Sequence, residues 1–409
     1  MRILLILFAA ATSIAQGPRV LFSNTTENLR GVSAVSQKVA WASGTHGTYL
    51  RTTDGNLWVA EQVPGAESLD FRGVVAFSAD EAFLMSAGPG DQSRIYHTAD
   101  AGRHWQLQFT NSNPKGFFDS MVFWDKTHGI VLGDPIPGES GSLKFELLMT
   151  DDGQTWKPLP ASQLQPAIEG EGAFAASNTC LAILPNRLVI PSEARDPGLP
   201  KPTPSAQVRQ PAAIDIPVTA EPSASQQKHS WKNGTLAPDP NIWFATGGKA
   251  ARVFHSPDLG RTWQIFDTPI THGPDSAGIF SISFLDSAHG VIAGGDYKHP
   301  EQDGPNLAFT NDGGKTWTLS TIRPQAYFSA AAYDRHTMTP PGKKKLDENQ
   351  VNARLFIVGP EFVFDFRPPA NPRRIGSGRK QKLQFNAVSP YPGGGALAVG
   401  PKGSMAMIP

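Results

Sequence analysis

The stretch that decides the fold is "HSPDLGRTW" at residues 255–263, because close relatives of it recur along the chain. These relatives are "HTADAGRHW" (97–105), "FTNDGGKTW" (309–317), "MTDDGQTW" (149–156) and "RTTDGNLW" (51–58). An aspartate carboxylate can accept backbone N–H groups inside a tight turn, and glycine supplies a positive φ there. The tryptophan that follows offers a large apolar surface to the next strand. The repeated stretch therefore predicts β-hairpin turns whose aspartates are structural.

One copy invites a different interpretation, because Gly314-Lys315-Thr316 looks like the end of a phosphate-binding loop. Such a loop needs a glycine five positions before the Gly-Lys pair, and Phe309 occupies that position. The residues from Trp317 onward favour a strand over the helix that such a loop requires. No dinucleotide-binding glycine motif is present either, so no cofactor is predicted.

The spacing of these stretches indicates the architecture. Their tryptophans lie at positions 58, 105, 156, 263 and 317, so the intervals are 47, 51, 107 and 54 residues. Periods of this size are typical of β-propeller blades. Residues 185–240 lie inside the long interval, are rich in Pro, Ser, Ala and Gln, and show no strand pattern. They are predicted to form a disordered insertion within the fourth blade.

The repeats resemble the Asp-box, or BNR repeat, of sialidase-type β-propellers. The resemblance implies a structural aspartate five residues before each tryptophan. These pairs are Asp100 and Trp105, Asp151 and Trp156, Asp258 and Trp263, and Asp312 and Trp317. The copy at 51–58 is one residue short, which leaves its register open.

Counting blades gives an all-β fold, a single seven-bladed propeller of four-stranded blades over residues 16–409. Inner strands are expected near 30–36, 73–78, 119–124, 171–177 and 279–285. A sixth blade is expected from Tyr327 to about Arg374. The seventh blade has three strands, "LQFNAVS", "GALAVGP" and "SMAMI", and the segment "RVLFSN" (19–24) would complete it and close the ring.

Composition and targeting signals narrow the functional classes. The chain has 36 basic and 36 acidic residues, which gives no electrostatic signature of nucleic-acid binding. Residues 1–15 read as a signal peptide with cleavage after Ala15, which predicts a secreted or periplasmic monomer. No later segment has the roughly 20 apolar residues that a membrane-spanning helix needs. The single cysteine, Cys180, is expected to be buried.

The candidate site lies on the propeller face opposite the aspartate turns, where the loops are long and polar. Six residues are expected near the axis on this face: Asp119, Asp134, Glu171, Arg252, Asp296 and Tyr297. Acidic groups in a central funnel could serve as acid and base, or could bind a cation or a sugar. The alternative is that these side chains only cap loops and join blades. No resident metal site is predicted.

Seven blades with "Gly-Asp-Pro" and "Gly-Gly-Asp-Tyr" after second strands resemble the photosystem II stability/assembly factor-like proteins. This resemblance implies an exported, non-enzymatic scaffold that binds a protein or carbohydrate ligand. The alternative is a sialidase-like glycoside hydrolase that uses a carboxylate pair from Asp134, Glu171 and Asp296. The chain lacks the early Arg-Ile-Pro motif that sialidases carry, which argues against sialidase activity itself.

Overall fold

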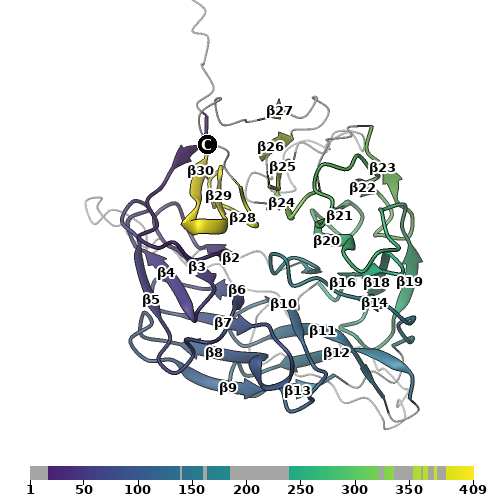
Figure 1. The fold of residues 1–409 in the computed structure, drawn as a ribbon, viewed down its shortest axis with the longest axis horizontal. Coiled ribbons are helices and arrows are strands. Elements are labelled where there is room, and N and C mark those ends of the chain that lie inside the picture. Colours follow the sequence, from purple (N-terminus) through teal and green to yellow (C-terminus); the bar gives the residue numbers. More distant parts are fainter. Residues whose placement is uncertain are drawn as a thin grey trace, which may run out of the picture.

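The computed structural model is a ring of seven antiparallel β-sheets around a central axis (Figure 1). It describes residues 17–138, 141–159, 164–184, 239–321, 327–335, 353–360, 363–366, 373–374 and 384–409. Apart from strands, these residues form two short 3-10 helices, η1 (Gly90–Gln92) and η5 (Pro401–Gly403). No helix among the described residues is long and apolar enough to cross a membrane. The predicted all-β, seven-bladed fold is confirmed.

The first three blades each contain four consecutive strands, from the inner strand outward. Blade 1 consists of β2 (Leu29–Ala34), β3 (Ala40–Gly44), β4 (Thr48–Thr52) and β5 (Val59–Gln62). Blade 2 consists of β6 (Phe71–Ala76), β7 (Ala82–Ser86), β8 (Arg94–Thr98) and β9 (Gln106–Thr110). Blade 3 consists of β10 (Phe118–Phe123), β11 (Gly129–Pro137), β12 (Leu143–Thr150) and β13 (Lys157–Pro158).

Blades 4 to 6 follow the same plan, with two extra strands on blade 5. Blade 4 consists of β15 (Leu181–Ile183), β16 (Ile242–Ala245), β18 (Arg252–Ser256) and β19 (Gln264–Asp267). Blade 5 consists of β20 (Ala277–Phe284), β21 (Gly290–Asp296), β22 (Leu307–Thr310) and β23 (Thr318–Leu319), and β14 (Glu171–Gly172) and β17 (Gly247–Gly248) extend its inner edge. Blade 6 consists of β24 (Ala330–Asp334), β25 (Arg354–Val358), β26 (Val363–Phe366) and β27 (Arg373–Arg374).

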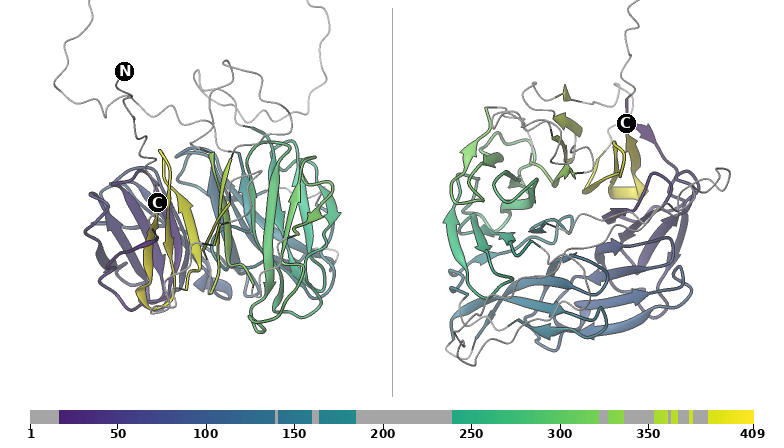
Figure 2. Two further views of the ribbon diagram at one scale, coloured as in Figure 1. Left: turned by 90° about the horizontal axis from the view of Figure 1, so that it is seen from above. Right: turned by 180° about the vertical axis from the view of Figure 1, so that it is seen from behind.

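Blade 7 combines a strand from near the start of the chain with three strands from its C-terminal part. It consists of β28 (Ala387–Pro390), β29 (Ala396–Val399), β30 (Met405–Ile408) and β1 (Arg19–Val20). Strand β1 pairs antiparallel with β30, with Arg19 opposite Met407. Figure 2 shows blade 7, in yellow, directly beside the purple strands of blade 1. The predicted closure by the N-terminal strand is confirmed.

The hydrophobic core lies between neighbouring blades. One buried cluster combines Trp41 and Tyr49 of blade 1 with Phe71 and Leu84 of blade 2. Buried serines on inner strands add polar contacts between blades. Ser281, for example, accepts the N–H of Ala331 at 2.9 Å. Each blade therefore buries its apolar faces only when both neighbours are in place.

The aspartate turns occur in two forms. In the long form, Asp312 Oδ1 accepts the backbone N–H of Lys315 and Thr316, at 3.1 and 3.0 Å. Gly313 and Gly314 both have positive φ in that turn. In the short form only one glycine has positive φ, and the aspartate lies four residues before the tryptophan.

The short form requires a correction at residues 149–156. The acceptor there is Asp152, whose Oδ1 receives the N–H groups of Gln154 and Thr155, both at 2.7 Å. Asp151, which the sequence analysis selected, is exposed. The turn at 51–58 has this same short form, with Asp54 as the acceptor.

The fourth blade also differs from expectation. Its inner strand is β15, so the strand predicted at 171–177 is wrong. The segment 173–179, called here the axial segment, instead lies near the axis, because its contacts reach blades 2, 3 and 6. Arg72 of blade 2 donates to the carbonyl of Ala175, and Ser177 donates to the carbonyl of Ser329 beside blade 6.

Some predictions lie outside the described residues. These are the signal peptide and positions 185–238 of the predicted insertion. The described residues on either side of the insertion are paired, because Ile183 of β15 is the register partner of Ile242 of β16. Cys180 is fully buried, as expected.

Candidate functional site

The inner strands of four blades have the same irregularity where they begin. The register shifts between Leu29 and Gly31, between Phe71 and Gly73, between Phe118 and Ser120, and between Ile279 and Ser281. Each shift is a β-bulge that leaves one extra residue, and a bulge re-aims the side chain it carries. The extra residues are Arg30, Arg72, Asp119 and Phe280. Because the bulges occupy equivalent positions, these four side chains surround the axis at one end of the ring.

Contacts link these side chains on the basic side of the axis. Asp70 Oδ2 lies 2.9 Å from Arg72 Nε and 3.4 Å from Arg30 Nη2. The charge of Arg72 also lowers the pKa of Asp119, although other effects outweigh it there. Arg72 Nη1 donates to the Ala175 carbonyl at 3.1 Å, which fixes the axial segment beneath the site.

Two carboxyl groups form the acidic side. Asp119 is 1% exposed, and burial, together with the charge of Asp134, raises its pKa well above the usual value. Its Oδ2 atom has no hydrogen-bond partner among the described residues. Asp134 is the extra residue at a register shift inside β11, and it accepts the N–H of Ala173 at 2.9 Å. Burial raises the pKa of Asp134 to about 6.

Aromatic rings complete the circuit. Phe174 lies edge-to-face against Phe280, with ring centroids 4.7 Å apart, and Phe280 meets Tyr327 at 5.6 Å. Tyr297 contacts both phenylalanines at 6.4 and 6.3 Å and is 47% exposed. Burial raises the pKa of the Tyr327 phenol, and the hydrogen bond with Ser329 and the charge of Arg30 oppose this increase. We call this set the axial ring: Arg30, Asp70, Arg72, Asp119, Asp134, Phe174, Phe280, Tyr297 and Tyr327.

Glu171 and Arg252 form a separate buried ion pair. The Glu171 side chain is fully buried and accepts from Arg252 Nε at 2.9 Å and from Arg252 Nη2. It also accepts from the Thr246 hydroxyl at 2.7 Å and from the Ile168 N–H at 3.0 Å. These contacts fasten β14 to blade 4. Glu171 is therefore an anchor, and a ligand could replace none of these four hydrogen bonds without breaking the anchor.

Asp296 likewise serves its own loop. Its Oδ1 accepts the Lys298 N–H at 2.9 Å, and its Oδ2 lies 2.7 Å from His299 Nδ1. Burial acts to raise the pKa of Asp296, but hydrogen bonds from His299, Ser276 and Lys298 lower it on balance. The carboxylate is stabilised as a loop cap.

The structure thus divides the six expected residues into two groups. Asp119, Asp134 and Tyr297 belong to the axial ring, whereas Glu171, Arg252 and Asp296 hold loops. Within the described residues, no three His, Cys, Asp or Glu side chains gather closely enough to hold a metal ion. The sequence analysis missed Arg30, Asp70, Arg72, Phe174, Phe280 and Tyr327.

A signal for part of this set was present in the sequence. Three inner strands begin with an apolar residue, a functional residue and a small residue: Leu29-Arg30-Gly31, Phe71-Arg72-Gly73 and Phe118-Asp119-Ser120. The small third residue has a steric cause. A Cβ on Gly31 would lie 2.7 Å from Ser43 Oγ and 3.0 Å from the Arg72 carbonyl of the next blade. Aligning these triplets would have identified the bulge residues.

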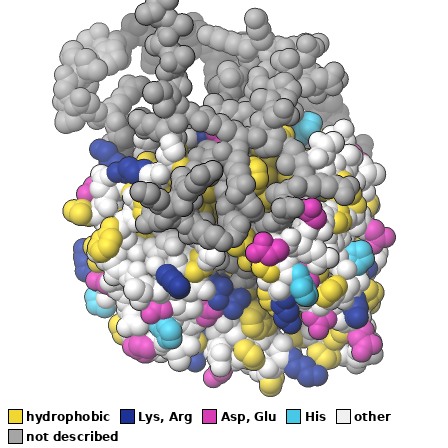
Figure 3. Space-filling model, turned by 45° about the horizontal axis from the view of Figure 1, so that its top comes forward, with side chains coloured by type: hydrophobic (Ala, Val, Ile, Leu, Met, Phe, Trp, Pro, Cys, Tyr) yellow, Lys and Arg dark blue, Asp and Glu magenta, His cyan; other side chains and the backbone are white. Residues whose placement is uncertain are grey.

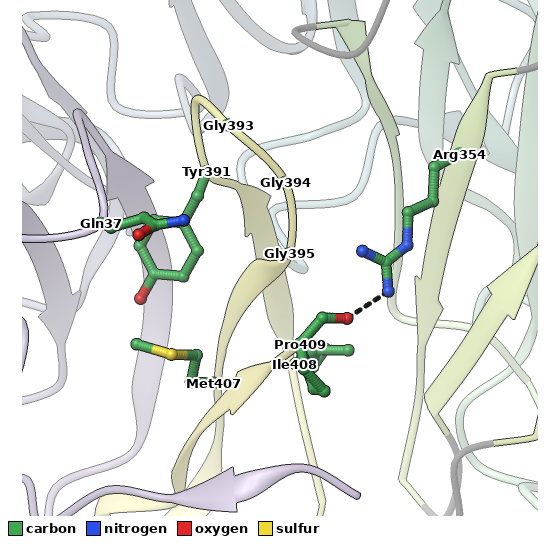
Figure 4. Close-up of a pocket in the computed structure, with 9 residues that line it drawn as sticks. All are labelled: Gln37, Arg354, Tyr391, Gly393, Gly394, Gly395, Met407, Ile408 and Pro409. Atoms are coloured by element: carbon green, nitrogen blue, oxygen red, sulfur yellow. Dashed lines mark hydrogen bonds between the residues drawn. The ribbon is translucent and has the colours of Figure 1, made fainter. Parts of the chain in front are cut away.

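A cavity of about 360 Å³ lies elsewhere, between blades 1, 6 and 7. Its walls include the turns at Gln37 and Gly393–Gly395, together with Tyr391 and the end of β30 (Figure 4). The Arg354 guanidinium at its edge is committed to Asp365, at 2.7 and 2.8 Å, and to the Pro409 carbonyl. These contacts join blades 6 and 7, so the cavity is a feature of the ring closure.

The outer surface shows no concentrated charge in the view of Figure 3. There, Lys and Arg side chains alternate with Asp and Glu over the described residues. Recognition by a broad field of one sign is therefore not indicated for this face.

No protein-family model and no curated protein sequence matches the chain. Many solved structures share its fold. The structure "YCF48 bound to D1 peptide" is 12% identical, with a TM-score of 0.55, and the match covers 96% of this chain and 97% of the other. YCF48 from Cyanidioschyzon merolae is 13% identical, with a TM-score of 0.53 and coverage of 96% and 98%. At such identities the likeness shows the propeller fold alone.

Enzymes share the fold as well. A streptogramin B lyase structure is 9% identical, with a TM-score of 0.53 and 96% coverage of both chains. The GH74 enzyme of Niastella koreensis is 12% identical, with a TM-score of 0.52, and the match covers 95% of this chain and 53% of that enzyme. Function has to be argued from the axial ring, because propellers support many activities.

Proposed function

We propose that this chain is an exported, non-enzymatic propeller that holds a segment of a partner protein over the axial ring. One observation carries this proposal: arginine, tyrosine and phenylalanine side chains converge at one end of the axis. Arginine and aromatic residues contribute most of the binding energy in many protein interfaces. Here Arg30 and Arg72 project from bulges on inner strands, and the ring of Phe280, from a third bulge, is buried in the scaffold beneath them, so the support is rigid.

The axial segment favours a binding site on one face of the ring and argues against a channel through it. The Asn178 side chain bonds to both the N–H and the carbonyl of Met121 in blade 3. Arg72 donates to the Ala175 carbonyl, and the Ser177 hydroxyl donates to the Ser329 carbonyl. The segment is thus tied down on several sides of the axis. A partner segment would lie on this floor and meet the ring from one face.

The likeness to YCF48 bound to a D1 peptide is consistent with this role, since that propeller binds a peptide. Export remains part of the proposal because of the signal-peptide pattern at residues 1–15. The aspartate turns do not indicate which ligand the protein binds, since their carboxylates already accept hydrogen bonds from backbone N–H groups.

The glycoside hydrolase alternative is less favoured by the geometry. It needs two carboxyl groups that flank a glycosidic bond. Glu171 is held in its ion pair and Asp296 caps its loop, which leaves Asp134 with only the deeply buried Asp119. A bound sugar without hydrolysis remains an outcome that the experiment below distinguishes.

The test uses residues 17–409, immobilised and exposed to a displayed library of random peptides and to a glycan array. We expect enrichment of peptides that bind at micromolar affinity, lost with Arg30→Gln and kept with Arg261→Gln. Arg261 is an exposed arginine on an aspartate turn, so it is a matched control. Melting curves confirm that both variants fold.

Two results would overturn the proposal. One is the absence of any enriched peptide together with binding of a glycan. The other is turnover of a glycoside substrate that disappears with Asp134→Asn.

A further inference from the structure

We propose that the acidic side of the axial ring is a subsite for a positively charged side chain, lysine or arginine, of the bound partner segment. This inference rests on the proposed function and names the chemistry of one position in the ligand. The groups that would form the subsite are Asp134, Phe174 and Tyr297, with Asp119 beneath them.

Asp134 has one carboxylate oxygen left for a ligand. Its Oδ1 is taken by the N–H of Ala173 at 2.9 Å, while no hydrogen bond to Oδ2 occurs within the described residues. The residue is half-buried, so this oxygen is partly shielded from water but still reachable. A shielded carboxylate attracts a cation more strongly than an exposed one.

Asp119 gives an independent indication. It is 1% exposed, and its Oδ2 is buried without a partner among the described residues. Asp119 and Asp134 lie on paired strands, because Phe118 is the register partner of Gly133 and the Asp134 N–H donates to the Phe117 carbonyl at 2.8 Å. Buried polar atoms are nearly always bonded, so an unpartnered carboxyl oxygen here indicates that something is missing from this position.

The charges around the axis are unevenly balanced. On the basic side, Asp70 Oδ2 contacts both Arg30 and Arg72, so the arginines have a counter-ion. On the acidic side, no Lys, Arg or His lies within ion-pair distance of Asp119 or Asp134 among the described residues. A ligand cation would supply the missing partner.

The aromatic rings select an organic cation over a bare ion. Phe174 directly follows Ala173, the residue whose N–H bonds to Asp134, and the Phe174 ring packs edge-to-face against Phe280 with centroids 4.7 Å apart. Tyr297 stands edge-to-face to Phe174 at 6.4 Å and is 47% exposed. Ring faces attract ammonium and guanidinium groups, and they also pack against the alkyl part of Lys or Arg.

The test measures binding of Nα-acetyl-lysine methylamide by NMR titration of residues 17–409, with Nα-acetyl-norleucine methylamide as the uncharged probe. We expect only the lysine compound to bind, and we expect Asp134→Asn to weaken its binding by about tenfold. Asp303→Asn should bind normally, because Asp303 is exposed on the loop after β21. Tyr297→Ala is a second variant that should keep the fold, since the Tyr297 side chain contacts only the rings of Phe174 and Phe280 among the described residues.

Equal binding of the two probes, unchanged binding by Asp134→Asn, or displacement of the lysine compound by an equal concentration of Na⁺ would overturn the proposal. The library experiment separates this inference from the proposed function. Peptides that depend on Arg30 but show no enrichment of lysine or arginine would keep the binding role and remove the cation subsite. Binding of the lysine compound without any selected peptide would keep the cation subsite and remove the peptide-binding role.

Discussion

Neighbouring aspartates of identical chemistry can differ completely in what they contribute. Both Asp151 and Asp152 are exposed, but Asp152 accepts two backbone N–H groups and the hydroxyl of Thr155, whereas Asp151 has no hydrogen bond among the described residues. Burial acts to raise the pKa of Asp152, but the hydrogen bonds from Thr155, Gln154 and Thr150 together lower it to about 2. The difference arises from the length of the turn, which the side chains alone do not reveal.

We expect Asp152→Ala to lower the free energy of unfolding by about 1–2 kcal/mol, because several N–H and O–H donors lose their acceptor. Asp151→Ala should change it by less than about 0.5 kcal/mol. Chemical denaturation of both variants checks this. Equal losses would mean that the acceptor had been assigned to the wrong aspartate.

Asp134 gives stability an unusual pH dependence. Burial raises its pKa to about 6 in the folded protein, above the roughly 3.9 expected in the unfolded chain. The folded state therefore binds this proton more tightly, so its contribution is complete below about pH 4 and is lost as the pH rises through 6. Asp119, whose pKa is also raised, acts in the same direction, and the nearby charge of Arg72 opposes it.

Asp134→Asn removes this titration while keeping an oxygen for the Ala173 N–H. We expect the variant to exceed the wild type in unfolding free energy by roughly 1–3 kcal/mol at pH 8 and to match it near pH 4. Unfolding measured across this range, with Asp303→Asn as the control, checks the sign. A variant that is less stable at pH 8 would contradict the assigned direction.

At the scale of elements, the axial segment is the part that the sequence could not reveal. Residues 171–177 have the small and apolar residues of an ordinary inner strand, and local patterns cannot show that their partners lie in blades 2, 3 and 6. The regular blades were predictable because each strand pairs with a neighbour close in sequence. The same limit applies to the site, since Phe174 reaches the axial ring only because this segment lies near the axis.

Asn178 holds the end of this segment. Its side chain accepts the Met121 N–H at 2.7 Å and donates to the Met121 carbonyl at 3.0 Å, so it replaces a strand pairing. Its φ is +62°, a conformation that asparagine and glycine tolerate better than alanine.

We therefore expect Asn178→Ala to destabilise the protein by about 2–4 kcal/mol, and Asn178→Gly by about 1 kcal/mol less. Comparison of the two melting transitions separates the lost hydrogen bonds from the backbone cost. If glycine is the more damaging substitution, the left-handed conformation is not what makes position 178 sensitive.

For the whole molecule, the blade count and the closure could be predicted because both depend on repetition. Tryptophan spacing set the period, and the missing strand of blade 7 identified Arg19–Val20 as its partner. The arrangement at the axis depends on a few non-repeated residues, so half of the candidate site was assigned to loop anchors.

Removal of residues before Asn28 should open the ring. The truncation deletes β1 and the Leu21 N–H bond to the Met405 carbonyl at 2.9 Å, which leaves β30 as an unpaired edge. We expect a lower melting temperature and concentration-dependent aggregation, measured by calorimetry and light scattering. A truncated protein that stays monomeric and melts like the 17–409 protein would show that closure contributes little.

The pairing of β1 with β30 also delays ring closure during synthesis of the chain. Arg19 and its contact Met407 are 388 residues apart, so at roughly 5–20 residues per second a ribosome needs about 20–80 seconds between them. During that delay the first strand has no partner, and blade 1 lacks the neighbour that buries Leu29 and Leu50. An interrupted polypeptide can never complete the circle. The native ring can therefore close only after β30 has been synthesised.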